Sequence, residues 1–220
     1  KDEIIKYLNL KKEKIQVVYL GVDNHEQTEK IENKNIKSFN YETQYILCVS
    51  SCVKYHNFIT ILESFKDIVY KDKKNIKFVF ISQVFDQEYL KEINQYIFKK
   101  FKNDEIFFYK NLDKENLKKF YNKALLYIFS SYCEVFGLTT LEAMSNNCPV
   151  LVSKTSALPE INSDCALYFD PDDKNEIRNK ILDLINNFDL RQSLKNKGLQ
   201  HVKNFKWSKT FESTMKIILN

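Results

Sequence analysis

Residues 125–153, LLYIFSSYCEVFGLTTLEAMSNNCPVLVS, contain two short apolar runs that flank one segment with helical spacing. The runs at 125–129 and 149–153 are continuously apolar rather than alternating, which is typical of strands buried on both faces of a parallel sheet. Apolar residues recur at helical spacing from Leu138 to Met144, which predicts a helix that begins near residue 137. This strand–helix–strand unit predicts a right-handed crossover between two parallel strands.

The same succession of short apolar runs and helical spacing extends along most of the chain. Further strands are predicted at residues 15–20, 45–50, 76–82, 106–109 and 167–169. Helices are predicted over residues 59–69, 89–101, 117–124 and 177–185, where apolar residues recur every three or four positions. The fold class that follows is α/β, with a doubly wound, mostly parallel, Rossmann-like sheet.

Both ends of the chain differ from this central pattern. Residues 24–41 are polar, so we expect residues 1–41 to be a connecting segment ahead of an α/β domain at 42–206. The first residue is Lys rather than Met, so we expect a piece of a longer protein. The last segment is amphipathic and predicts a final helix over residues 207–220, capped by Ser208.

The composition disfavours several classes of protein. The 220 residues carry 34 basic and 29 acidic side chains, a net charge of +5, without the basic, aromatic stripe that nucleic-acid binding uses. No apolar run approaches the ~20 residues of a membrane span, and the N-terminus lacks the features of a signal peptide. The five cysteines form no CxxC pair and lie mostly in apolar runs, which favours free thiols in a reducing compartment over a metal site.

The loop and helix after residue 129 carry the residues best placed for chemistry. Open parallel sheets bind ligands outside the carboxyl ends of their strands. A helix that begins near Gly137 offers free N–H groups and the positive end of its dipole to an anion. Glu134 and Glu142 flank that point, and carboxylates accept hydrogen bonds from adjacent hydroxyls, as the hexose and ribose of a nucleotide diphosphate sugar would require. On spacing alone, two surface carboxylates and a simple turn explain these residues equally well.

The sequence of this region resembles a known family. Residues 134–144, EVFGLTTLEAM, followed by residues 148–153, CPVLVS, resemble the E-x7-E and P-V-I-x-S signatures of glycosyltransferase family 4, the retaining "group 1" enzymes with the GT-B fold. The resemblance covers about residues 15–220. It implies that the chain is the C-terminal, donor-binding half of such an enzyme. It also implies that residues 14–23 connect to a missing N-terminal acceptor domain, towards which the last helix packs back.

The resemblance further implies roles for individual residues. Glu134 would be a catalytic residue that contacts hydroxyls of the donor sugar, and Glu142 would accept hydrogen bonds from the ribose diol. The backbone around Asn111 and Leu112 would meet the base. The substrate would be a UDP-sugar or a GDP-sugar, with no cofactor and no metal. The diphosphate or sugar would be held by backbone N–H groups of Phe136, Gly137, Leu138 and Thr139.

One segment departs from the family's sequence. The family has G-R-x(4)-K-N after its first donor-domain strand, whereas this chain has Ser51 in place of the Arg and His56 in place of the Lys. Negative charge grows on the leaving diphosphate, so a cation there lowers the barrier. His56 serves as a catalytic, diphosphate-contacting residue if it is protonated, and an adjacent anion raises its pKa. Lys54 is an alternative cation, and an exposed loop histidine is the alternative interpretation of His56. Lys110 occupies a position that is usually Gly, at the base pocket.

Two classes of function remain open. The first is the donor-binding domain of a retaining glycosyltransferase, incomplete for turnover by itself, that passes a sugar to a saccharide or lipid-linked acceptor. The second is a non-catalytic nucleotide-sugar-binding or scaffold module with a degenerate diphosphate site. A nucleotide-sugar epimerase of the same architecture agrees less well with residues 134–144. We expect a cytoplasmic protein without nucleic-acid partners, whose peripheral contact with the inner face of the membrane, if any, runs through the missing half.

Overall fold

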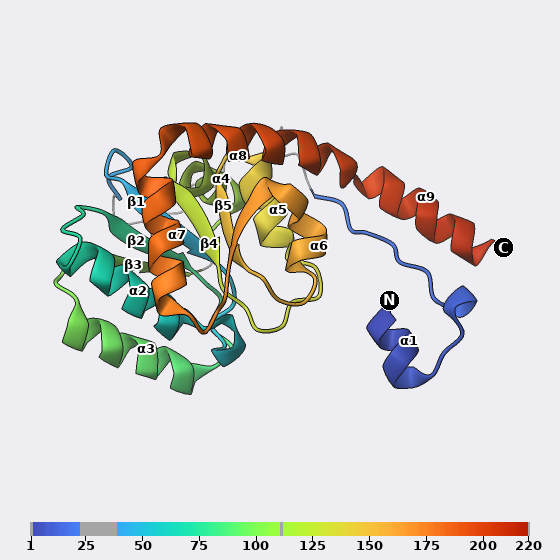
Figure 1. Ribbon diagram of the computed structural model, residues 1–220, viewed down its shortest axis with the longest axis horizontal. Helices are drawn as coiled ribbons and strands as arrows, with labels where there is room; N and C mark the ends of the chain where they lie inside the picture. The colour runs from blue at the N-terminus through green and yellow to red at the C-terminus, as the bar shows by residue number, and fades with distance from the viewer. Residues whose placement is uncertain (1, 23–38, 111, 220) are drawn as a thin grey trace.

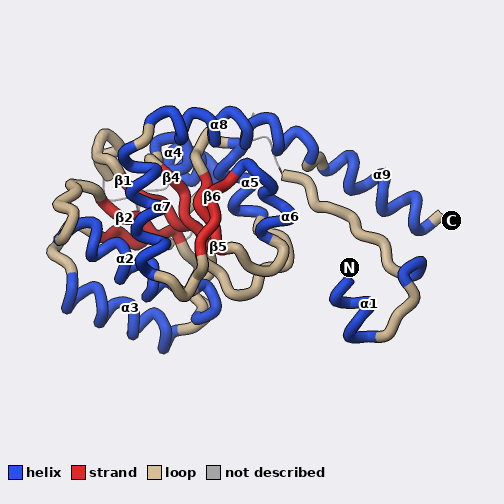
Figure 2. The backbone as a smooth tube through the Cα atoms, in the orientation of Figure 1, coloured by secondary structure: helices blue, strands red, loops and turns tan. Residues whose placement is uncertain are grey.

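The computed structural model describes residues 2–22, 39–110 and 112–219, which form a six-stranded sheet with helices on both faces (Figure 1 and Figure 2). All strand pairs are parallel, and the strand order is β3-β2-β1-β4-β5-β6. This confirms the doubly wound, Rossmann-like α/β fold and six of the seven predicted strands. The strands are β1 Tyr45–Val49, β2 Lys77–Ile81, β3 Ile106–Tyr109, β4 Leu126–Phe129, β5 Val150–Ser153 and β6 Ala166–Phe169.

Helices cover both faces of the sheet, and its strands are therefore apolar on both sides. Along β1, Tyr45 and Leu47 enter one hydrophobic core, whereas Ile46 and Cys48 enter the other. The helices of the first core are α4 Lys114–Lys123, α5 Leu138–Ser145 and α6 Leu158–Asn162. The helices of the second core are α2 Phe58–Tyr70, α3 Gln87–Lys100 and α7 Lys174–Asn186.

Aspartate side chains fix where three of these helices begin. Asp86, Asp113 and Asp173 accept backbone N–H groups of the first turns of α3, α4 and α7 at 2.8–2.9 Å. Each bond satisfies an N–H group that the helix itself leaves unpaired. Helix α5 begins differently, because Gly137 precedes it and offers no side-chain cap. The N–H groups of its first turn are therefore not covered by a capping side chain.

The sequence did not indicate α8, Phe188–His201, as a separate helix. Among its residues only Leu194 and Gly198 are buried, so its apolar stripe is too narrow to stand out. A Cβ added at Gly198 would lie 3.0 Å from the Met144 side chain, so α8 packs closely on α5. The chain then passes through η4 Val202–Asn204 to α9 Trp207–Ile218.

The predicted strand at residues 15–20 is wrong. These residues belong to no sheet, because contacts with the start of α9, rather than a neighbouring strand, hold them. Oγ1 of Thr210 donates to the carbonyl oxygen of Tyr19 at 2.7 Å. A Cβ added at Gly21 would lie 2.3 Å from the backbone nitrogen of Trp207, so this close approach requires glycine.

Most of the predicted connecting segment, residues 23–38, lies outside the described residues. Phe39 is buried in the first core, where its ring contacts Tyr45 and Phe120 with centroids 5.0 and 5.5 Å apart. The chain is therefore anchored to the sheet and to α4 before β1 begins.

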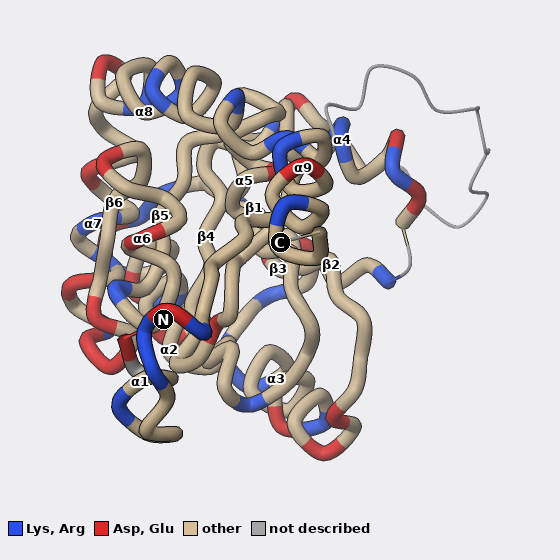
Figure 3. Tube along the Cα trace, turned by 90° about the vertical axis from the view of Figure 1, so that its right-hand side faces the viewer, with Lys and Arg blue, Asp and Glu red and all other residues tan. Residues whose placement is uncertain are grey.

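Helix α1 Asp2–Leu8, η1 Lys12–Lys14 and α9 lie on the same side of the α/β body (Figure 1 and Figure 3). Figure 3 shows basic and acidic residues interspersed along them. The predicted final helix is confirmed as α9, but Ser208 is not its cap, because the helix begins at Trp207 without a side-chain cap. The exposed apolar side chains of α1 and α9 include Tyr7, Leu8, Trp207, Phe211 and Ile218.

Candidate functional site

The candidate site lies where the loops that follow β1 and β4 meet. These two strands are neighbours, but the chain continues from β1 towards one edge of the sheet and from β4 towards the other. Open α/β sheets bind ligands outside the carboxyl ends of the strands at such a switch point. The N–H of Tyr132 donates to the carbonyl oxygen of Tyr55 at 2.8 Å, which ties the two loops together. The site therefore combines η2 Lys54–His56 with residues 130–137 and the first turn of α5.

The first turn of α5 presents backbone N–H groups without partners. Gly137 precedes the helix with φ 84° and ψ 46°, the left-handed region that favours glycine. Within the described residues, no group accepts a hydrogen bond from the N–H of Gly137, Leu138 or Thr139. The helix dipole adds positive partial charge at the same place. This arrangement can bind an anion.

Two buried tyrosines hold this turn against the sheet. The hydroxyl of Tyr127 donates to the carbonyl oxygen of Val49 at 3.0 Å and is hydrogen-bonded with Oγ1 of Thr139 at 2.7 Å. The hydroxyl of Tyr121 donates to the carboxylate of Glu142 at 3.2 Å. Burial raises the pKa of both tyrosines well above the ordinary value of 10.0, so both remain protonated at neutral pH. The network fixes the start of α5 relative to the end of β1.

Glu134 and Glu142 lie around the same helix terminus. After the larger effect of burial, the charges of both carboxylates contribute to the raised pKa of Tyr127. Oε1 of Glu134 accepts hydrogen bonds from the N–H groups of Val135 at 3.0 Å and Phe136 at 3.3 Å. The Phe136 N–H is therefore already paired within its loop. Oε2 of Glu134 makes no hydrogen bond with any described residue and is available to a ligand.

His56 belongs to this site as a buried side chain, 6% exposed. Its Nδ1 lies 2.6 Å from the carbonyl oxygen of Ser51, and its ring packs against Phe129 with centroids 5.3 Å apart. Burial lowers the pKa of His56 below the ordinary value of 6.5, although the bond to Ser51 and the charge of Glu134 act in the opposite direction. The alternative of an exposed loop histidine is therefore wrong. Without a bound anion, the ring is neutral at neutral pH.

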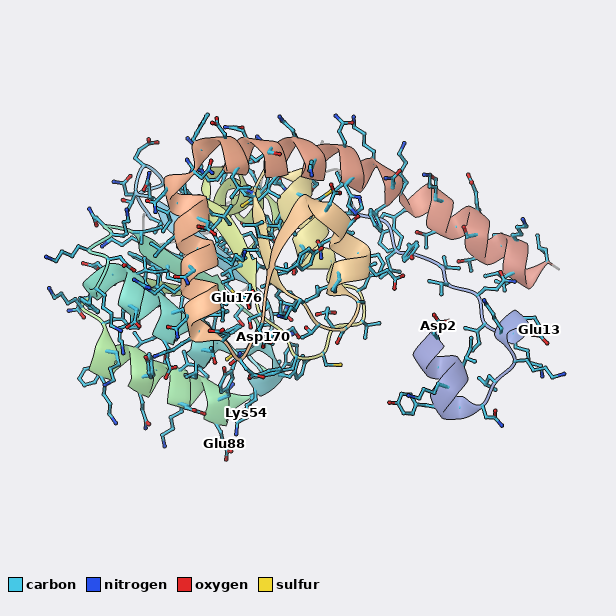
Figure 4. The ribbon with its side chains drawn as sticks, viewed as in Figure 1. Asp2, Glu13, Lys54, Glu88, Asp170 and Glu176 are labelled. Atoms are coloured by element: carbon cyan, nitrogen blue, oxygen red, sulfur yellow. The ribbon has the colours of Figure 1, made fainter. Side chains whose placement is uncertain are left out.

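The other predicted residues are placed as follows. Ser51 is half-buried beside His56, whereas Lys54 is exposed at the lower end of the body in Figure 4, the end where Asp170 follows β6. Leu112 is half-buried and packs against the first core. Asn111 lies outside the described residues. The structure thus brings together Ser51, His56, Glu134 and the first turn of α5, and the base-binding prediction stays a prediction.

Some residues of the site were missed by sequence reasoning. Oγ of Ser130, directly after β4, is buried and has no hydrogen-bond partner in the described part of the chain. Four neighbouring strands have a serine at their carboxyl ends. This repetition in the sequence could have indicated that these serines lie at the edge of the sheet where the site is. These residues are Ser82, Ser50, Ser130 and Ser153.

Neither a group of metal ligands nor a membrane-spanning helix is found among the described residues. Among the described residues, no three His, Cys, Asp or Glu side chains are grouped as a metal ion would need. None of the helices in those same ranges is long and apolar enough to cross a membrane. The five cysteines are unpaired, and all except Cys133 are buried.

Comparison with known sequences identifies a family. The family model described as "Glycosyl transferases group 1" matches residues 29–201. Among curated proteins, the O-antigen chain mannosyltransferase RfbU of Salmonella typhimurium is 29% identical over 174 residues, which are 79% of this chain and 45% of that protein. The chain thus spans less than half the length of this relative.

Comparison with solved structures supports the fold. A glycosyltransferase from Rickettsia africae superposes with a TM-score of 0.82 at 14% identity, over 98% of this chain and 59% of that chain. The C-terminal domain of a glycosyl transferase group 1 family protein (LpcC) from Francisella tularensis has a TM-score of 0.65 at 24% identity, over 73% of this chain and 85% of that chain. At these identities the similarity concerns the fold.

Proposed function

The chain belongs to the group 1 glycosyltransferases, and on that basis we propose that it is the donor-binding domain of a retaining enzyme of family 4 with the GT-B fold. The domain would bind a nucleotide diphosphate sugar at the start of α5. One comparison supports the assignment to the C-terminal half, because the Francisella structure is named as a C-terminal domain. This chain spans 45% of the Salmonella mannosyltransferase, which agrees with one half of a longer enzyme.

The observation that carries this proposal is the set of unpaired backbone donors at the start of α5. The N–H groups of Gly137, Leu138 and Thr139 have no partner among the described residues, and they lie at the switch point of the sheet. Carboxylates of Glu134 and Glu142 flank them. A diphosphate between two sugars matches this order, because amides bind the anion and each carboxylate accepts from hydroxyls.

Each group then has a role in the proposed reaction. The three N–H groups hold the diphosphate and stabilise the charge that grows on it as the glycosidic bond breaks. Oε2 of Glu134 accepts from hydroxyls of the donor sugar, while Oε1 keeps the loop in place. Glu142, oriented by Tyr121, accepts from the ribose diol. The side chains proposed to meet the leaving group are His56, which is neutral in the free protein, and the exposed Lys54 of η2.

The first donor to test is GDP-mannose, because the Salmonella relative is a mannosyltransferase. The acceptor would be a saccharide or a lipid-linked saccharide, bound mainly by a second half. Helices α1 and α9, which carry exposed apolar residues, lie on one side of the body (Figure 1), the side proposed to face that half.

A non-catalytic module remains the second candidate, and one observation favours it. Ser51 provides no positive charge, and His56 is buried with a lowered pKa. A diphosphate site whose buried side chains provide no constitutive cation would bind weakly and would stabilise a leaving group poorly.

Calorimetric titration with GDP-mannose and UDP-glucose distinguishes the two candidates. We expect saturable binding, and we expect Glu142→Ala to weaken it at least roughly tenfold, because hydrogen bonds to a charged group contribute about 1.5–3 kcal/mol each. Glu142→Gln keeps an oxygen that can accept from the Tyr121 hydroxyl. Comparison of the two variants therefore separates the effect of losing the carboxylate from the effect of losing the bond to Tyr121. Glu88→Ala, on the exposed surface of α3 (Figure 4), is the matched control and should bind like the parent. A folded protein that binds neither compound supports the scaffold module instead.

A further inference from the structure

His56 is held in one tautomer by its backbone partner. The carbonyl oxygen of Ser51 lies 2.6 Å from Nδ1, and a carbonyl oxygen can only accept, so Nδ1 carries a proton. In the neutral ring, Nε2 therefore has a free lone pair. The ring gains positive charge only when Nε2 takes up a proton.

Nε2 is not sealed in the core. No described residue forms a hydrogen bond with Nε2 of His56. Among the described residues, the fully buried side-chain atoms without a partner are Ser130 Oγ and Asn162 Oδ1, and Nε2 is not one of them. Nε2 therefore reaches solvent although the residue as a whole is 6% exposed. A ligand that enters from solvent can reach this atom.

The charged and titratable groups around His56 come from three elements. Its own helix η2 contributes Lys54 and Tyr55, both exposed. The loop after β4 contributes Glu134, whose charge favours the protonated ring, and Tyr132, whose hydroxyl donates to Asp172 of the loop after β6. None of these groups forms a hydrogen bond or ion pair with the imidazole, so its charge depends on burial and on what is bound.

We propose that His56 takes up one proton from solvent at Nε2 when the diphosphate of a nucleotide sugar binds, and gives it back when the nucleotide leaves. This proposal rests on the proposed function of the site. No covalent bond changes, because the step converts a neutral imidazole and a solvent proton into an imidazolium beside the anion. The anion stabilises the imidazolium that burial alone disfavours. A site with a neutral resting state thereby acquires its cation only with its substrate.

Proton uptake makes binding depend on pH. Above the lowered pKa of the free His56 and below the raised pKa in the complex, the association constant should fall up to about tenfold per pH unit. Protein variants then separate charge from structure. His56→Lys supplies a constitutive cation and should bind with little pH dependence near neutrality. His56→Asn places an amide N–H near the position of Nδ1, from which it can still donate to the carbonyl of Ser51, but it cannot be charged, so it should bind weakly at every pH.

The test is calorimetry of the complete chain with GDP-mannose or UDP-glucose in PIPES and in Tris at one neutral pH. The diphosphate of these compounds carries no group that titrates near neutrality, so a difference in observed enthalpy between the two buffers counts protons exchanged by the protein. We expect uptake approaching one proton per ligand in the parent and in His201→Gln, a control for the half-buried histidine on the carbonyl of Ile161. We expect none in His56→Lys.

The outcomes separate this proposal from the function itself. Binding with the same enthalpy in both buffers overturns proton uptake and leaves the donor-binding assignment intact. Uptake that persists in His56→Lys assigns the proton to another group and also overturns it. Absence of binding by the folded parent chain overturns the donor-binding function, and the proposal with it.

Discussion

Replacement of Gly137 with alanine tests the geometry at the start of α5. The backbone there has φ 84°, where an L-residue costs about 1–2 kcal/mol. The new Cβ would also lie 2.7 Å from Cδ2 of Leu158, which is fully buried, and overpacking such a side chain costs about 1–3 kcal/mol. Gly137→Ala should therefore lower the free energy of unfolding by about 2–5 kcal/mol.

A second substitution separates the two contributions. Leu158→Val removes the δ-carbon that the new Cβ would strike and costs about 1 kcal/mol by itself. In that background, Gly137→Ala should cost only about 1–2 kcal/mol, because the backbone contribution alone remains. The assay is urea unfolding of the parent, both single variants and the double variant, followed by circular dichroism. An equal cost of Gly137→Ala in both backgrounds refutes the steric reasoning.

Gly198→Ala provides the control for glycine replacement in general. Gly198 lies within α8 without a left-handed backbone, and its added Cβ would lie 3.0 Å from Met144. The gain in helix propensity, about 1 kcal/mol, offsets that contact. A stability within about 1 kcal/mol of the parent is expected.

Two further predictions concern Tyr127 and His56. Tyr127→Phe removes a buried hydroxyl bonded to Val49 and Thr139, so the free energy of unfolding should fall by about 1–3 kcal/mol in urea; an unchanged value would mean that the network does not anchor α5. The lowered pKa of His56 means that the unfolded chain binds its proton first as the pH falls below 6.5. Stability should thus be insensitive to this group above that pH and decrease below it, by at most about 1.4 kcal/mol per pH unit. Urea unfolding of His56→Gln across the same pH range should show a shallower decrease, and identical slopes would contradict the lowered pKa.

Much of the fold followed from the sequence because strands buried on both faces are continuously apolar. Six strands and the helices α2, α3, α4, α5 and α7 were therefore predictable, whereas the short α6 was not predicted. Residues 15–20 have the same apolar composition, but no neighbouring strand offers them a ladder, and this depends on tertiary arrangement. Helix α8 was hidden because it buries few residues.

The site was predictable in part. Gly137 and the two flanking glutamates mark a helix terminus in the sequence, and the structure places them together. Two features depend on strand order and could not be predicted from spacing. The hydroxyl of Tyr127 meets Val49 across neighbouring strands, and the burial of His56 results from packing on Phe129.

Whether the start of α5 binds the donor can be measured from the backbone amide signals in NMR spectra during titration with GDP-mannose or UDP-glucose. We expect the largest shift changes on Gly137, Leu138 and Thr139, with smaller ones in the loop after β1 and little change in α7. Saturable binding whose largest shift changes lie away from the start of α5 would contradict this expectation.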